Sequence, residues 1–265
     1  MWIAVLSIES CQNAFAQGEI MMKFKCGVLL ALFCSVFVPR LQAAESPDRK
    51  SFTNESEAGI VVANGNSRSQ TLNFKQLNSY AWLENILKFT ARFTKSSSRG
   101  VDSVYYWSLG LRYERVLTDR FSVFASQALE SDLFAGYLQR YNTDVGGKQV
   151  LLKDDGWLWN LEAGYRYMKE HRFTQPDVKN HFVRLYSDVN KVWTPTFSTL
   201  LWLEYLPNLT NSSAYQVNSE LSLTAVMTDV FSLKSAYLMK YNHAPSSAAA
   251  EKTDTLLTTA LVAKF

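Results

Sequence analysis

Residues 104–115 read VYYWSLGLRYER, and their chemical character alternates from one position to the next. One set of alternate positions is aromatic or aliphatic: Tyr105, Trp107, Leu109, Leu111 and Tyr113. The intervening set is Tyr106, Ser108, Gly110, Arg112 and Glu114. Successive side chains of a β-strand point to opposite faces, so this stretch predicts a strand with one apolar and one largely polar face.

The same alternation covers most of the chain beyond residue 56, as in WLWNLEAGYRY (157–167) and YQVNSELSLTAV (215–226). Many runs extend over about ten residues, longer than the five or six usual in globular proteins. We expect twelve strands, an even number, at 57–63, 69–79, 83–94, 103–116, 121–130, 136–146, 157–168, 180–193, 196–206, 214–227, 230–242 and 254–265.

The expected connections differ in length at the two ends of the sheet. Short turns are predicted at 117–120, 194–196 and 227–230, and Asp155-Gly156 is a hairpin signal. Longer polar loops are predicted at 95–102, 168–180, 207–214 and 242–254, with a tight hairpin at 63–69 as the exception. Short turns, longer loops and an even strand count are typical of an all-β, transmembrane, antiparallel up-and-down barrel of the bacterial outer membrane.

The membrane decides which strand face points outward. Lipid offers no partner for a bare sheet edge, so the sheet must close and present an apolar band of about 25 Å to the bilayer. A soluble barrel would reverse the faces, but 7 Trp, 13 Tyr and 16 Phe favour the membrane alternative. The residues then predicted to face the lumen are Arg92, Arg112, Glu114, Glu162, Arg166, Arg184, Asp188, Glu204 and Glu220.

The last residues, TLLTTALVAKF (255–265), alternate up to a terminal phenylalanine. A barrel pairs its last strand with its first, so this segment is expected to close the sheet. The apolar face is predicted to be the assembly signal that the barrel-assembly machinery recognises: Leu257, Leu261, Ala263 and Phe265. We also expect periplasmic chaperones as partners during biogenesis, and lipid and lipopolysaccharide as partners in the membrane.

The amino-terminal region predicts export. From Met22 the chain has a basic start, an apolar run over 26–38 and a cleavage site near Ala43, which is typical of a secretory signal peptide. The run is shorter than the roughly 18 residues of a membrane-spanning helix, which disfavours a retained anchor. We therefore expect residues 1–43 to be an over-extended start plus the signal peptide, 44–55 a periplasmic tail and 56–265 the barrel.

Composition disfavours several functions. All three cysteines, Cys11, Cys26 and Cys34, precede the expected cleavage site, so the exported chain would have no disulfide and no cysteine metal site. A net charge of only +3 argues against nucleic acid as a partner. We expect no metal and no cofactor.

Four blocks carry a resemblance to a known family: AGIVVANGNSRSQTLNF (58–74), LESDLFAGYLQRYNTDVGG (129–147), LEAGYRY (161–167) and KTDTLLTTALVAKF (252–265). They resemble successive blocks of the YdiY-like salt-induced outer-membrane proteins, domain of unknown function 481. The resemblance implies an outer-membrane barrel of Gram-negative bacteria without a settled activity. The matching positions are Gly65, Asn66, Asp132, Gly136, Gly146, Gly147, Gly164, Tyr165 and Asp254.

Catalysis is not expected. A lipid hydrolase would need a serine activated by a histidine, and a serine two residues after a histidine is absent at His171, His181 and His243. Asp154 and Asp155 are adjacent carboxylates, but they belong to the expected hairpin. The open functions are a narrow, weakly selective channel induced by salt or envelope stress, a structural or adhesive barrel without transport and, remotely, a lipid hydrolase.

Overall fold

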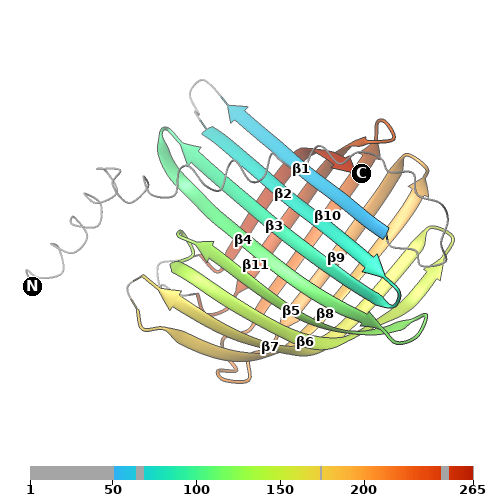
Figure 1. The fold of residues 1–265 in the computed structure, drawn as a ribbon. Helices are drawn as coiled ribbons and strands as arrows, with labels where there is room; N and C mark the ends of the chain where they lie inside the picture. The colour runs from blue at the N-terminus through green and yellow to red at the C-terminus, as the bar shows by residue number, and fades with distance from the viewer. Residues whose placement is uncertain (1–50, 64–68, 174, 246–250, 265) are drawn as a thin grey trace, which may run out of the picture. The chain divides into compact units, whose positions relative to one another are not determined.

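The computed structural model describes residues 51–63, 69–173, 175–245 and 251–264. These residues form twelve strands that follow one another along the chain (Figure 1). They are β1 (Ser51–Ala63), β2 (Ser69–Trp82), β3 (Asn85–Ser98), β4 (Val101–Val116), β5 (Phe121–Asp132), β6 (Tyr137–Asp154), β7 (Trp157–Arg172), β8 (Val178–Thr194), β9 (Phe197–Leu206), β10 (Gln216–Val226), β11 (Phe231–Asn242) and β12 (Thr253–Lys264).

The sheet is a closed barrel in which each strand pairs antiparallel with its neighbours in the sequence. Its last seam joins β12 to β1, with register from Glu55–Lys264 to Ala58–Leu261. This pairing leaves no free edge, which is the condition that a membrane sheet must meet. The predicted antiparallel up-and-down barrel of twelve strands is therefore confirmed.

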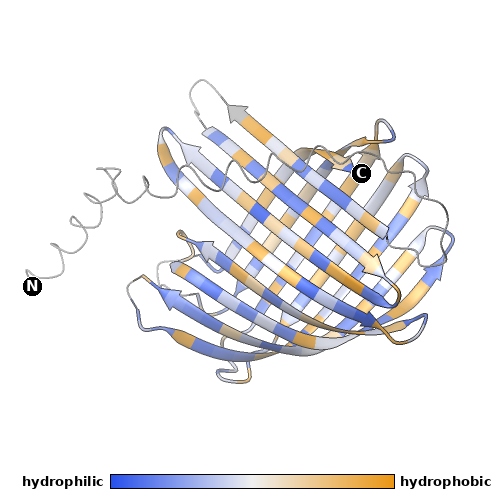
Figure 2. Ribbon diagram, in the orientation of Figure 1, coloured by the Kyte–Doolittle hydropathy of each residue, from blue (hydrophilic) through white to orange (hydrophobic). Residues whose placement is uncertain are grey.

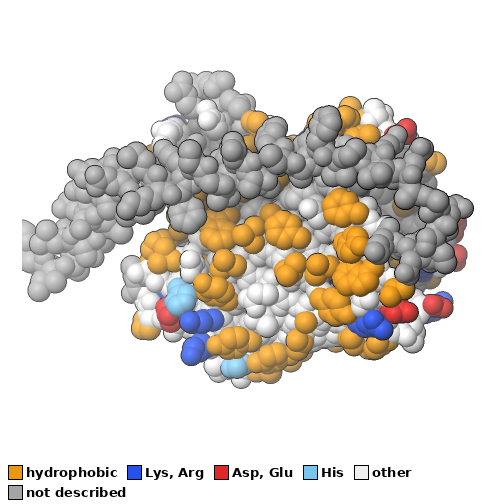
Figure 3. Space-filling view, viewed as in Figure 1, with side chains coloured by type: hydrophobic (Ala, Val, Ile, Leu, Met, Phe, Trp, Pro, Cys, Tyr) orange, Lys and Arg blue, Asp and Glu red, His pale blue; other side chains and the backbone are white. Residues whose placement is uncertain are grey.

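The barrel is apolar outside and polar inside. On β4, Tyr113 is 42% exposed on the outer surface, whereas its neighbour Glu114 is 1% exposed in the interior. Figure 2 shows the same alternation of hydrophobic and hydrophilic positions along the strands, and Figure 3 shows apolar side chains spread over the outer face. A soluble barrel would place these groups the other way round, so the arrangement is that of a transmembrane barrel.

No helix among the described residues is long and apolar enough to cross a membrane.

Several strands are longer than the sequence predicted. β1 begins at Ser51, so residues 51–55 of the expected tail are part of a strand. The loop predicted at 95–102 is almost entirely strand, because β3 and β4 are joined only by Arg99 and Gly100, both with positive φ. Polar residues near the end of a strand look like loop in the sequence, but sheet pairing satisfies their backbone groups equally well.

β6 shows the largest extension, since it continues to Asp154 rather than ending at 146. Within the added part, the register against β7 shifts once, between Val150 and Leu152. The expected hairpin follows directly, and Asp155 and Gly156 have φ values of 27° and 75°. Glycine adopts such values without steric cost, which explains the Asp-Gly pair at this turn.

On the closing strand, Leu257 and Leu261 lie on the outer surface, at 71% and 47% exposure. Ala263 lies on the same face and pairs with Ser56 of β1. Phe265, the fourth residue of the predicted assembly signal, lies outside the described residues.

Candidate functional site in the barrel interior

All nine charged residues that were predicted to face the lumen turn their side chains into the barrel interior. Arg112 of β4 binds Glu162 of β7, although β5 and β6 lie between these strands, and such a contact is possible only through the interior. Asp188 accepts a hydrogen bond there from Asn160, at 2.8 Å. The interior also holds charged residues that the prediction omitted: Glu57, Lys75, Lys88, Glu130, Arg140, Asp144, Lys148, Glu170, Lys234 and Lys240.

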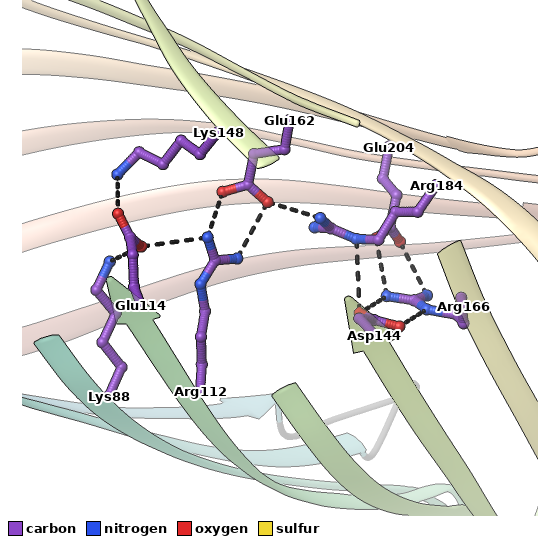
Figure 4. Close-up of polar contacts among 9 residues, drawn as sticks. All are labelled: Lys88, Arg112, Glu114, Asp144, Lys148, Glu162, Arg166, Arg184 and Glu204. Atoms are coloured by element: carbon purple, nitrogen blue, oxygen red, sulfur yellow. Dashed lines mark hydrogen bonds and ion pairs between the residues drawn. The ribbon is translucent and has the colours of Figure 1, made fainter. Parts of the chain in front are cut away.

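Nine of these side chains form a continuous ladder along the wall from β3 to β9 (Figure 4). Its members are Lys88, Arg112, Glu114, Asp144, Lys148, Glu162, Arg166, Arg184 and Glu204. At its centre, Arg112 donates two hydrogen bonds to Glu162, of 3.0 and 2.8 Å, and Arg184 donates a third, of 2.6 Å. The Glu162 carboxylate is thus fixed by two guanidinium groups from different strands.

The two ends of the ladder repeat this principle. At one end, Glu114 accepts hydrogen bonds from Ser122 and Lys148, at 2.8 and 3.1 Å. At the other, Arg166 donates to Asp144, at 2.7 and 2.8 Å, and to Glu204, at 3.1 Å. Burying a carboxylate is unfavourable unless cations and donors surround it, and each of these carboxylates has several.

An aromatic side chain supports the ladder from the barrel wall. Phe124 of β5 faces inward and is 5% exposed, and the Arg112 guanidinium lies 3.8 Å from the centre of its ring. The ring occupies space that Gly146 leaves free, since a Cβ there would lie 2.9 Å from the ring and 2.6 Å from the Ala163 carbonyl oxygen. Gly164, opposite Gly146, would place a Cβ 2.5 Å from the Val145 carbonyl oxygen.

We expect Gly164→Val to destabilise the barrel by about 1–3 kcal/mol, because the added atoms collide with backbone that cannot move aside easily. Ala163→Val is the matched control, since Ala163 is the next residue and faces outward. Urea titrations of the refolded variants measure the difference in the free energy of unfolding. The folded fraction at each urea concentration is read from the migration of unheated samples on gels. Equal stability of the two variants would contradict the assigned role of the glycine pair.

Two other contacts join opposite walls of the barrel. Arg92 of β3 lies 3.7 Å from Glu220 of β10, and Lys240 of β11 lies 4.1 Å from the centre of the Tyr106 ring of β4. In the strand order, four strands separate each pair on one side and six on the other. Tyr106 is held in place by its hydrogen bond to Glu130, at 3.0 Å. These side chains therefore span the lumen rather than line it.

Further inward side chains lie on either side of these bridges. Toward β1, Glu57 pairs with Lys234 at 2.7 Å and with Lys75 at 3.4 Å. Near the end with the longer loops, three inward apolar side chains are almost fully buried together: Met168, Phe182 and Leu206. A cavity of about 250 Å³ remains at this end, lined by Arg140, Met168, Glu170, Arg172, Val178, Asn180, Asn211, Ala214, Gln216, Asn242, Ala244 and Pro245.

The histidines are engaged in local contacts. His171 pairs with Asp177 at 2.6 Å, His181 contacts the Tyr165 hydroxyl, and His243 contacts the Tyr241 hydroxyl at 2.9 Å. Within the described part of the chain, no group of three or more His, Cys, Asp or Glu residues is arranged to hold a metal ion.

A closed sheet with an apolar exterior and an ion-paired interior defines the protein as a transmembrane β-barrel. The chain belongs to the family described as protein of unknown function, DUF481, whose model matches residues 56–265. No curated protein matches it in sequence.

Among solved structures, an outer membrane channel from Pseudomonas putida F1 is similar over 86% of this chain and 100% of its own, with 14% identity and a TM-score of 0.49. The NanC porin is similar over 80% of this chain and 97% of its own, with 11% identity and a TM-score of 0.47.

Proposed function

We propose that the protein is an outer-membrane barrel of Gram-negative bacteria that acts as a narrow, weakly selective channel. The observation that carries this proposal is the pair of contacts between opposite walls, Arg92–Glu220 and Tyr106–Lys240. Barrels of about twelve strands lie between the filled eight-stranded barrels and the 16- to 18-stranded porins. In a lumen of this modest width, two bridges leave only small passages along the walls.

Weak selectivity follows from the mixture of charges. Pores that strongly prefer one ion type usually present rings of a single charge sign. Here Lys88, Arg112, Lys148, Arg166 and Arg184 lie among Glu114, Asp144, Glu162, Asp188 and Glu204 along the same wall. The two signs largely cancel each other, so neither cations nor anions gain a strong advantage.

Most of the arginines that alternation places in the lumen do not cross it. Arg112 and Arg166 bind carboxylates along the wall from β3 to β9. Arg92 and Lys240 instead reach the opposite wall. The channel proposal therefore rests on Arg92 and Lys240.

We expect the Arg92→Ala, Lys240→Ala double variant to conduct severalfold more than the wild type in planar bilayers, because both bridges are removed. Lys95→Ala is the control, since Lys95 is a cation of the same strand that pairs with Asp102 at 2.9 Å and is 38% exposed. Unchanged conductance of the double variant would reject the bridging mechanism. Absence of conductance in both wild type and variant would favour a structural barrel without transport.

The proposed location has its own test. We expect the exported chain to fractionate with outer membranes and to migrate differently on gels with and without boiling, because closed barrels retain their shape in detergent until heated. Identical migration in a soluble periplasmic fraction would reject the location.

Sequencing the amino terminus of the mature chain tests cleavage near Ala43, and transcript levels after a salt shift test the proposed induction.

A further inference from the structure

Two lysines lie side by side on the outer surface near the end of the barrel with the longer loops. Lys169 is on β7 and Lys179 is on β8, and they are direct partners in the register of these strands. Their neighbours in the chain, Met168 and Asn180, are buried in the interior. Because successive side chains of a strand point to opposite faces, both lysines face outward. The two ammonium groups therefore project from the outer wall, three residues before β7 ends and one residue after β8 begins.

This arrangement is electrostatically unfavourable by itself. Like charges directly opposite each other on neighbouring strands destabilise a sheet. Among the described residues, no carboxylate lies within ion-pair distance of either lysine. Glu170, next to Lys169, faces the interior and binds Arg140 and Arg172. Asp177, just before β8, pairs with His171 at 2.6 Å. An anion from outside the chain would neutralise the pair.

The surroundings are those of a membrane interface. Tyr141 of β6 lies opposite Lys169, and its ring meets His171 edge-on at 6.1 Å between centroids. Two residues further along the same two strands, Tyr167 lies opposite His181, with 5.3 Å between the ring centroids. In Figure 3, histidine, basic and acidic side chains lie together at the edge of the apolar surface, at the place where β7 ends in Figure 1. Aromatic girdles of this kind lie at the level of lipid headgroups.

We propose that Lys169 and Lys179 form a binding site for the phosphate of a phosphomonoester-bearing membrane lipid. The outward direction of both side chains favours a lipid over a solute, because a solute passing through the lumen would not meet them. The acyl chains of such a lipid would lie along the apolar outer wall below the lysines, where Val183 and Tyr165 continue the same two strands. The proposal depends on membrane insertion but not on channel activity.

Native mass spectrometry of the full chain, refolded in detergent and titrated with phosphatidic acid, tests the site. We expect the Lys169→Ala, Lys179→Ala variant to bind about 25-fold more weakly, since each lysine near an anionic membrane surface contributes roughly fivefold. Arginine at both positions should retain binding, because guanidinium groups also bind phosphate well. The alanine variant should fold, since removing the lysines relieves repulsion, and the arginine variant should fold because it keeps the charges of the wild type. Gel migration of unheated samples verifies both.

Lys191→Ala is the matched control, because Lys191 faces outward at the opposite end of β8 and contacts the Trp157 ring at 4.8 Å. We expect it to bind phosphatidic acid like the wild type, and the wild type to bind phosphatidylcholine of the same chain length weakly. Equal loss in the Lys191 variant, or equal binding of the two lipids, would overturn the proposal. Displacement of the lipid by inorganic phosphate would instead indicate a solute site and would also overturn it. If the wild type binds the lipid as expected but does not conduct, the channel proposal fails and the lipid site stands.

Discussion

The absence of water in the bilayer core determines the architecture of this protein. Every backbone N–H and C=O within the membrane needs a partner from the chain itself, and a sheet can provide all of them only by closing on itself. The seam between β1 and β12 completes that closure. Once the sheet is closed, alternation along each strand gives an outer face for lipid and an inner face that is shielded from it. The charged interior depends on this shielding.

Shielding, however, makes unpaired charge expensive in the interior. The ladder from β3 to β9 meets this constraint by placing cations from different strands around its carboxylates, as Arg112 and Arg184 both bind Glu162. Space for these long side chains comes from Gly146 and Gly164, where the wall is thin enough to admit the Phe124 ring beneath Arg112. The glycines, the ring and the ion pairs therefore form one packing unit. The glycines leave room for the Phe124 ring, and the ring supports the Arg112 guanidinium.

The two halves of the interior have different roles in this picture. The ladder of ion pairs stiffens one wall and leaves its charges neutralised. The contacts of Arg92 and Lys240 cross the lumen and depend on fewer partners, with a 3.7 Å ion pair in one case and a cation–π contact in the other. Each of these contacts joins one cation to one partner, whereas each carboxylate of the ladder has several hydrogen-bonded or charged partners. Moving Arg92 or Lys240 would therefore change the open space in the lumen at a lower energetic cost than rearranging the ladder.

The sequence by itself determined the class of fold. Alternation with a period of two identified all twelve strands and their polar faces, because the direction of a side chain on a strand depends only on its position in the chain. It also placed Arg112, Glu162 and Arg184 on the inner face. Strand ends were less certain: the serines at 96–98 resemble loop, and only their pairing with β2 and β4 makes them strand.

Tertiary structure decided which interior residues meet. Arg92 and Glu220 belong to strands that are far apart in the sequence, and their contact depends on the number of strands and their register around the closed barrel. The role of Phe124 could not be predicted from the sequence either. An aromatic residue on a polar face is recognised as a support for Arg112 only once its contact with Gly146 is known. Alternation fixes direction along one strand, whereas contact across a lumen is a property of the closed sheet as a whole.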